Sequence, residues 1–155
     1  MTPNPQTTAT MAAFGFPATL IADHRWWAVL LRPKQPTLGS LVLAAKVDVT
    51  AFSLLPQEAF AELADAVRAI ESSLKAFCGY ERINYLMLMM VDPHPHFHVI
   101  PRYSGSRSFE SLELPDHGWP GPPALERAVA LDALQKAALV PRLRTLWPPQ
   151  YRATS

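Results

Sequence analysis

Three histidines alternate with other residues in the segment His94-Pro95-His96-Phe97-His98, and this alternation constrains the fold more than any other feature of the chain. Side chains two residues apart in a β-strand point to the same face, so a strand here would place all three imidazoles together. Imidazole is neutral near pH 7 but easily protonated, so it can attack an electrophile, relay a proton or bind an anion. The pattern therefore predicts a strand that carries a site for a phosphate ester.

A metal site is the main alternative for these histidines, because histidine is the commonest metal ligand. In an extended strand, the Cα atoms of His94 and His98 would lie about 13 Å apart. Zinc needs ligand nitrogens at about 2.0–2.1 Å, so the outer rings would have to lean sharply inward. No Cys-x-x-Cys or His-Glu-x-x-His motif accompanies them, although Asp92 and Asp23-His24 are candidate extra ligands. We expect no metal and no other cofactor, and a zinc-dependent hydrolase is the third functional hypothesis.

The hydrophobic pattern elsewhere predicts strands and one long helix. Apolar clusters bounded by turn residues predict strands at residues 19–21, 26–31, 38–45 and 83–91, followed by the histidine strand. The run 83–91 is almost wholly apolar, as in a central strand buried on both faces, and Asp92-Pro93 makes a short turn into the histidines.

The predicted helix lies between these strands. Apolar residues spaced three and four apart from Phe60 to Phe77 mark one helix face. Pro56 suits the first turn of this helix and Gly79 suits its end. The order of elements indicates an α+β fold with an antiparallel sheet of about five strands, one long packing helix and a C-terminal helix.

The two ends differ from this central part. Residues 1–15 are rich in Thr, Pro and Ala, so we expect a loose N-terminal arm before a domain at residues 16–103. Residues 104–155 are predicted to form a proline-rich loop and a C-terminal helix packed on the same domain. Residues 125–139 have a helical pattern, and we expect Pro141 to interrupt it.

Composition narrows the possible partners. A chain of 155 residues with a net charge of +1 fits one globular domain without broad attraction to nucleic acid polymers or membranes. The single cysteine, Cys78, excludes an internal disulfide and fits a reducing compartment. The N-terminus shows no cationic segment before an apolar core, and the longest apolar run is too short to span a bilayer. We therefore expect a cytoplasmic location.

The histidine segment resembles the His-x-His-x-His-x-x signature, with x apolar, of the histidine triad superfamily: here it is His94-Pro95-His96-Phe97-His98-Val99-Ile100. The following Pro101-Arg102 also looks like that family, and a weaker likeness extends upstream to about Leu20. The resemblance implies a histidine-triad-like fold, a homodimer and nucleotide substrates, which in the family are dinucleoside polyphosphates, nucleoside phosphoramidates and nucleotidyl sugars.

The resemblance also implies a mechanism. The middle histidine of the triad, here His96, would attack phosphorus and form a nucleotidyl-histidine intermediate that water resolves. His94 and His98 would orient the phosphate and assist the leaving group. The chain would then be a nucleotide hydrolase or nucleotidyl transferase that cleaves a phosphoanhydride or phosphoramidate bond.

Two departures from the family pattern favour an alternative, a nucleotide-binding or scaffolding protein with little turnover. Ser40 stands where the family often has a fourth histidine, and a hydroxyl cannot carry its charge. The Gly-Gln-Ser/Thr-x loop that contacts phosphate in many members is missing, because Val91 leads through Asp92-Pro93 straight to His94.

Four further polar residues are candidates for substrate binding. The Ser40 hydroxyl could bond a phosphate oxygen, and Arg32 falls where family members bind the ribose. Asn84 interrupts an apolar strand and could bond the substrate or cap an edge. Arg102 follows His98 by four residues, so it either binds phosphate from the histidine face or pairs with a carboxylate of the tail, such as Glu110 or Asp116.

Overall fold

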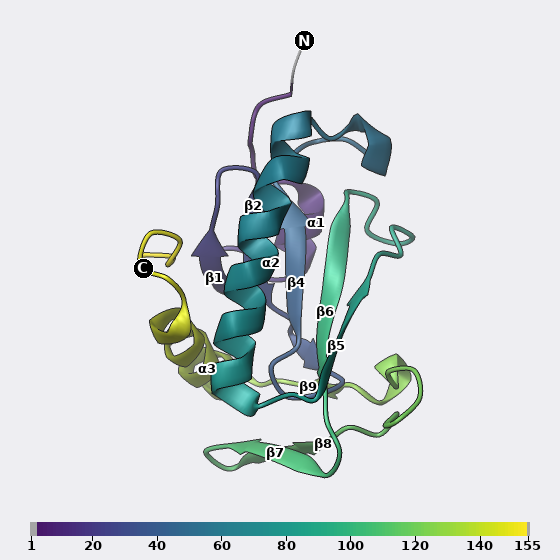
Figure 1. Cartoon of the computed structure of the whole chain (residues 1–155), viewed down its shortest axis with the longest axis vertical. Helices are drawn as coiled ribbons and strands as arrows, with labels where there is room; N and C mark the ends of the chain where they lie inside the picture. Colours follow the sequence, from purple (N-terminus) through teal and green to yellow (C-terminus); the bar gives the residue numbers. More distant parts are fainter. Residues whose placement is uncertain (1–2, 155) are drawn as a thin grey trace.

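A five-stranded sheet crossed by one long helix forms the centre of the computed structural model, which describes residues 3–154 (Figure 1). The strands of the sheet are antiparallel and lie in the order β1-β2-β4-β6-β5. Their bounds are β1 Leu20–Asp23, β2 Trp27–Leu31, β4 Leu41–Ala45, β5 Arg82–Leu86 and β6 His96–Arg102. Two strand pairs lie outside it: β3 Lys34–Gln35 with β9 Val129–Ala130, and β7 Ser106–Phe109 with β8 Leu112–Pro115.

Three α-helices and two short 3-10 helices complete the described part. They are α1 Ala9–Ala13, η1 Phe52–Leu54, α2 Gln57–Cys78, η2 Leu125–Arg127 and α3 Ala133–Leu146. The long helix α2 begins directly after Pro56 and ends at Gly79, which adopts the left-handed conformation with φ 55° and donates its N–H to the carbonyl of Lys75. The predicted α+β class, with an antiparallel sheet, a long packing helix and a C-terminal helix, is confirmed.

The two faces of the sheet carry separate apolar clusters, because alternate residues of each strand point to opposite sides. One face packs on α2 and α3, and the other packs on α1 (Figure 1). The strand residues on the α2 side include Val29, Leu31, Leu41, Leu43 and Val99, whereas Ala28, Leu30, Val42 and Ala44 lie on the α1 side with Met11. The histidine strand β6 therefore has one face toward α2 and one toward the N-terminal segment.

The N-terminal stretch is ordered where the structure describes it, which corrects the expected loose arm at residues 1–15. Residues 9–13 form α1, and Thr8 caps this helix by accepting from the N–H of Met11. Met11 is only 1% exposed. Burying a methionine side chain contributes roughly 1.5–3 kcal/mol, which offsets part of the entropy cost of ordering a short segment whose composition indicates no core.

The apolar run 83–91 was expected to be a central strand, and this prediction is wrong. Strand β5 ends at Leu86 and lies at the edge of the sheet. Beyond it the chain leaves the sheet, and Leu88, Met90 and Val91 are exposed. An apolar run has no periodicity that distinguishes a central strand from an edge strand followed by a loop, so only the strand order decides its position.

The C-terminal helix also differs from its predicted range. Residues 125–130 form η2 and β9, and α3 begins after Asp132, whose side chain forms a capping box with Gln135. Pro141 lies inside α3 and does not end it. The helix continues because Val140 and Leu143, on either side of the proline, are buried against the body of the protein.

Candidate active site

The three histidines lie together on the face of the sheet that α1 covers. His96 and His98 belong to β6, where they lie opposite Ala44 and Val42 of β4, and His94 precedes the strand. His94, His96 and His98 are 7%, 2% and 7% exposed. The structure therefore has the three rings on one face of the sheet, as the alternation predicted.

The ring of His96 is fixed by a backbone contact. Its Nδ1 lies 2.7 Å from the carbonyl oxygen of His94. A carbonyl can only accept, so Nδ1 carries the hydrogen and donates it. In the neutral ring, Nε2 then holds the lone pair. The geometry makes Nε2 of His96 the nitrogen available to attack an electrophile.

Both ring nitrogens of His94 are occupied by the protein. Nε2 lies 2.9 Å from Oδ1 of Asp48, and Nδ1 lies 2.8 Å from the hydroxyl oxygen of Thr10. The carboxylate accepts from Nε2–H, so in the neutral ring Nδ1 accepts from the Thr10 hydroxyl. The same hydroxyl oxygen accepts from the backbone N–H of His94 at 3.3 Å. His94 thus has no free nitrogen for chemistry in this arrangement, which suits a residue that holds its neighbours in place.

His98 is held in its neutral form. Burial, together with the nearby Arg32 and His96, lowers its pKa to about 4. The Nε–H of Arg32 donates to Nδ1 of His98 at 3.3 Å, so the hydrogen of the neutral imidazole lies on Nε2. His98 can therefore donate a hydrogen bond to a phosphate oxygen at neutral pH.

The structure brings Arg32, a candidate ribose-binding residue from the sequence, into contact with His98. Arg32 follows β2, and its Nη1 also donates to the carbonyl of Lys34. Burial lowers the pKa of this guanidinium from its ordinary value. A cavity of about 240 Å³, lined in part by Phe14, Arg32 and Lys34, lies beside this group. A cation here can attract the phosphates of a ligand.

Phe14 covers the histidines from the N-terminal segment. Its ring centroid lies 5.5 Å from that of His96 and 5.6 Å from that of His98. The low exposure of His96 follows from this contact. The Phe14 ring therefore forms part of the wall around His96 and His98.

Ser40 does not contact the triad in the structure. Its hydroxyl donates to the carbonyl of Thr37 at 2.8 Å, and its backbone N–H donates to the side-chain oxygen of Gln35. Ser40 is fully buried. These contacts close the turn between β3 and β4. The polar groups of Ser40 are thus used within this turn.

Asn84 and Arg102 contact each other at the far end of β6. Nη1 of Arg102 donates to Oδ1 of Asn84 at 2.8 Å, and the guanidinium forms a two-bond ion pair with Asp116 at 2.7 and 3.1 Å. Arg102 is 4% exposed. This arrangement matches the second of the two predicted alternatives, pairing with a carboxylate of the tail.

Thr10, Phe14 and Asp48 were not among the residues that the sequence singled out. Thr10 lies 84 residues and Asp48 lies 46 residues from His94 in the sequence. No local motif joins these positions, so no signal in a single sequence could have found them. Within residues 3–154, no group of three or more His, Cys, Asp and Glu side chains is arranged to hold a metal ion.

Comparison with solved structures identifies the architecture. A histidine triad protein from Bradyrhizobium japonicum matches with a TM-score of 0.70 and 20% identity over 94% of this chain and 100% of its own. One from Marinobacter aquaeolei matches with a TM-score of 0.71 and 23% identity over 93% and 96%. A hypothetical histidine triad nucleotide-binding protein from Sulfolobus tokodaii matches with a TM-score of 0.64 and 17% identity over 88% of each chain.

The chain has the histidine triad fold. The fold that the resemblance implied is thereby confirmed over most of the chain. No family model matches the sequence, and no curated protein matches it either. At identities near 20%, the structural likeness concerns the backbone, and the roles of individual residues must be argued from their own geometry. No helix among the described residues is long and apolar enough to cross a membrane.

Proposed function

We propose that this histidine triad protein is a nucleotide hydrolase or nucleotidyl transferase that works through a nucleotidyl-histidine intermediate at His96. The observation that carries the proposal is the bond from Nδ1–H of His96 to the carbonyl of His94. This bond leaves the lone pair of the neutral His96 ring on Nε2. On one side of His96 lies His94, whose two ring nitrogens both have partners in the protein, and on the other lies the neutral His98. An imidazole nitrogen is a good nucleophile toward phosphorus and a good leaving group afterwards.

The two steps follow from this arrangement. Nε2 of His96 forms a bond to phosphorus while the bond from phosphorus to the leaving oxygen or nitrogen breaks. The leaving group departs with the bonding electron pair and takes up a proton from solvent, which the water or hydroxyl that attacks in the second step later returns. A water molecule or another acceptor hydroxyl then attacks phosphorus, the bond to Nε2 breaks, and His96 recovers its lone pair. Nε2–H of His98 stabilises the charged phosphate oxygens in both steps.

The nucleoside attached to this phosphorus would bind beside Phe14 and Arg32. The cavity there has a volume of about 240 Å³, smaller than the roughly 300–1,000 Å³ of ordinary ligand sites. Outward rotation of Phe14 would enlarge it and uncover His96 in the same movement. Among the substrate classes implied by the resemblance, dinucleoside polyphosphates and nucleoside phosphoramidates are the ones to test.

A binding or scaffolding protein with little turnover is the second candidate. The observation that favours it is the coverage of His96, which is 2% exposed beneath Phe14. Ser40, bonded within its own turn, contributes no charge to the site. Such a protein would bind nucleotide without forming a covalent intermediate.

Covalent trapping separates the two candidates. The protein is mixed with a nucleotide substrate labelled at the phosphorus attached to the nucleoside, quenched rapidly and assayed for bound label. We expect label that is lost on acid treatment, as a phosphorus–nitrogen bond requires. His96→Ala should lose turnover by several orders of magnitude while still folding, and His94→Ala or His98→Ala should lose less. A His96→Ala protein with a near-native rate would contradict the proposal.

Two further properties belong to this proposal. We expect a homodimer, as the resemblance implies, and a reducing compartment such as the cytoplasm. Cys78, the single cysteine, is buried, and burial raises its pKa to about 11, so it stays a thiol. We also expect activity without a metal ion, because each ring nitrogen of His94 already has a partner in the protein.

A further inference from the structure

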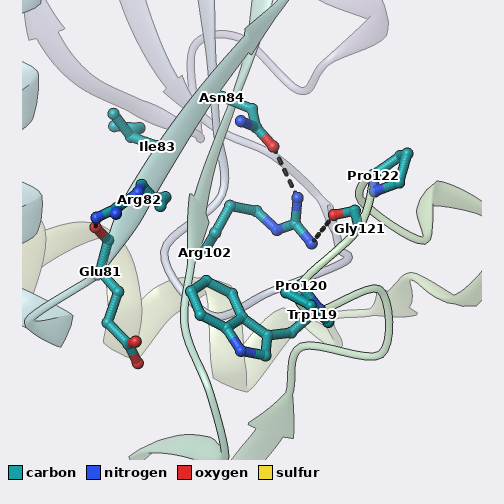
Figure 2. A pocket seen from close by; sticks show the side chains of 9 residues that line it. All are labelled: Glu81, Arg82, Ile83, Asn84, Arg102, Trp119, Pro120, Gly121 and Pro122. Carbon is teal, nitrogen blue, oxygen red and sulfur yellow. Dashed lines mark hydrogen bonds between the residues drawn. The ribbon is translucent and has the colours of Figure 1, made fainter.

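The side chain of His24, between β1 and β2, is buried without a hydrogen-bond partner. It is 4% exposed, and neither of its ring nitrogens has a partner within residues 3–154. Buried polar groups are normally paired, as the guanidinium of Arg102 is by Asn84 and Gly121 in Figure 2. Leaving a buried polar group unpaired costs about 1–3 kcal/mol, so His24 carries a cost that an apolar residue would avoid.

The C-terminal strap, defined as residues 148–154, covers this histidine. The ring of Tyr151 stacks on the ring of His24, with a centroid distance of 4.0 Å and an angle of 23° between the planes. The strap follows α3 and returns to the sheet, so its end lies beside the strand that leads into His24 (Figure 1). Tyr151 thus forms part of the cover that keeps this imidazole from solvent.

Two backbone hydrogen bonds join the strap to edge strand β1. The N–H of Asp23 donates to the carbonyl of Tyr151 at 2.8 Å, and the N–H of Ala153 donates to the carbonyl of Ile21 at 3.0 Å. The side chain of Arg152 bonds the end of α3. A terminal segment held by so few bonds can leave the edge of the sheet without unfolding its centre.

The carboxylates that act on His24 are bonded to other groups. These carboxylates and their partners are Glu62 with the backbone N–H groups of Arg25 and Trp26, Asp23 with Lys46, and Asp65 with Arg68. None of them accepts a hydrogen bond from His24, whose ring nitrogens are both unpaired among the described residues.

The cations and the strap offer no acceptor to the ring either. Lys46 donates to the backbone carbonyl of His24 at 2.8 Å, and the guanidinium of Arg25 lies over a neighbouring indole. The strap brings Tyr151 and Arg152, and neither side chain is an anion near neutral pH. An imidazolium formed at His24 would therefore be buried beside a cation and without an acceptor.

The closed strap consequently favours the neutral imidazole. Burial lowers the pKa of His24 below its ordinary value of 6.5, although Glu62, Asp23 and Asp65 raise it and Lys46 lowers it further. Because the pKa is lower in the fold than in the unfolded chain, the stability of the closed arrangement is complete above about pH 6.5 and is lost as the pH falls. A charged imidazole gains hydrogen bonds to water only where water can reach it, so the charged form favours a released strap.

We propose that His24 and Tyr151 form an acid-sensitive latch, in which protonation of His24 releases the C-terminal strap from the edge of β1 while the sheet stays folded. Release frees the N–H of Asp23 and the carbonyl of Ile21, which are groups that another strand can pair with. The latch lies at the opposite edge of the sheet from β5 and needs no nucleotide, so it goes beyond the proposed function.

Amide hydrogen exchange of the wild type at pH 8 and pH 5 tests the latch. Each rate is expressed as a protection factor relative to the free peptide at the same pH, which removes the intrinsic effect of pH on exchange. The amides of Asp23 and Ala153 should lose most of their protection at pH 5, whereas the amide of Leu43 in the central strand β4 should keep it. At pH 5 His98, whose pKa is about 4, is still neutral, so the two histidines are separated.

Three variants assign the effect to the stacked pair. His24→Phe keeps a ring against Tyr151 but does not titrate, so its strap should stay protected at both pH values. It should also unfold at a temperature no lower than that of the wild type, because two unpaired buried atoms are removed. Tyr151→Ala should lose protection of the strap at both pH values. His117→Phe, at an exposed histidine of the proline-rich loop, is the matched control and should behave as the wild type does.

Equal protection of Asp23 and Ala153 at the two pH values in the wild type would overturn the latch. A loss at pH 5 that persists in His24→Phe would also overturn it, because another group would then be titrating. A matching loss at Leu43 would show that the whole sheet opens. If His24→Phe does not fold, the ring nitrogen signals of His24 in the wild type decide: they must titrate over the pH range in which the strap loses protection, and titration over a different range rejects the latch.

Discussion

Burial decides the charge of His98, and this has a consequence for stability. The pKa of His98 falls from an unfolded value of 6.5 to about 4 in the fold. At pH values between about 4 and 6.5, His98 is protonated in the unfolded chain but neutral in the folded protein. The contribution of neutral His98 is therefore complete above about pH 6.5 and is lost as pH falls toward 4, by up to about 1.4 kcal/mol per pH unit.

Urea unfolding from pH 4 to 8 measures this effect when the wild type is compared with His98→Gln. Glutamine keeps an acceptor for Arg32 but does not titrate, so the wild type should lose stability more steeply below pH 6.5. The comparison removes the contribution of His24, whose pKa burial also lowers. Parallel curves for the two proteins would show that His98 is not held neutral.

Thr10 is the residue through which the N-terminal helix controls His94. Thr10→Val removes the hydroxyl that bonds both Nδ1 and the backbone N–H of His94, and it leaves these groups buried without a partner. We expect a loss of about 1–2 kcal/mol in the free energy of unfolding. Turnover should fall as well, because the His94 ring is less constrained. Thr7→Val, at an exposed position, should change stability by less than about 0.5 kcal/mol in the same urea titration.

Between elements, the Arg102–Asp116 pair joins strand β6 to the proline-rich loop. Arg102→Ala would leave the Asp116 carboxylate buried without its cation, and we expect a loss of about 3 kcal/mol in stability. The double variant Arg102→Met, Asp116→Leu removes both charges and should recover part of this loss. Thermal unfolding measures the stability of Arg102→Ala and of the double variant. If Arg102→Ala unfolds at the wild-type temperature, the pair does not hold the loop.

For the whole molecule, the predicted homodimer has a surface that fits it. Edge strand β5 has a free side, and the chain after it exposes Met90 and Val91, which are 81% and 93% accessible. An apolar cavity of about 210 Å³ opens next to this strand, lined by residues such as Tyr85 and Phe97. Exposed apolar side chains beside an unpaired strand edge are a setting in which a second copy can add its own strand.

Light scattering at micromolar concentration should give twice the monomer mass. Val91→Asp should shift the mass toward that of the monomer, because it would bury a charge in the interface. Leu134→Asp on α3, an equally exposed apolar position, should leave the mass unchanged. A monomer mass for the wild type would reject the dimer.

Local patterns determined much of this structure. The alternation of His96 and His98 placed both rings on one face because side chains alternate in any strand, and His94, just before the strand, lies on the same side through its bond to Thr10 of α1. The helical spacing of apolar residues before Gly79 placed α2, because an apolar stripe must be buried and glycine tolerates the left-handed conformation that ends a helix. Both patterns depend only on residues close in the sequence.

The remaining features of the structure depend on contacts between segments that are far apart in the sequence. Whether the run 83–91 is central or at an edge depends on strand order. The packing of the N-terminal segment from residue 8 to residue 16 depends on an apolar face formed by β2 and β4. The partners of His94 come from positions 10 and 48, and Arg102 bonds Asp116 rather than a carboxylate elsewhere in the tail. The sequence by itself determined which histidines form the candidate site and which face they share. Only the tertiary structure decided which nitrogen is free and what covers it, because these depend on segments that meet solely in the folded chain.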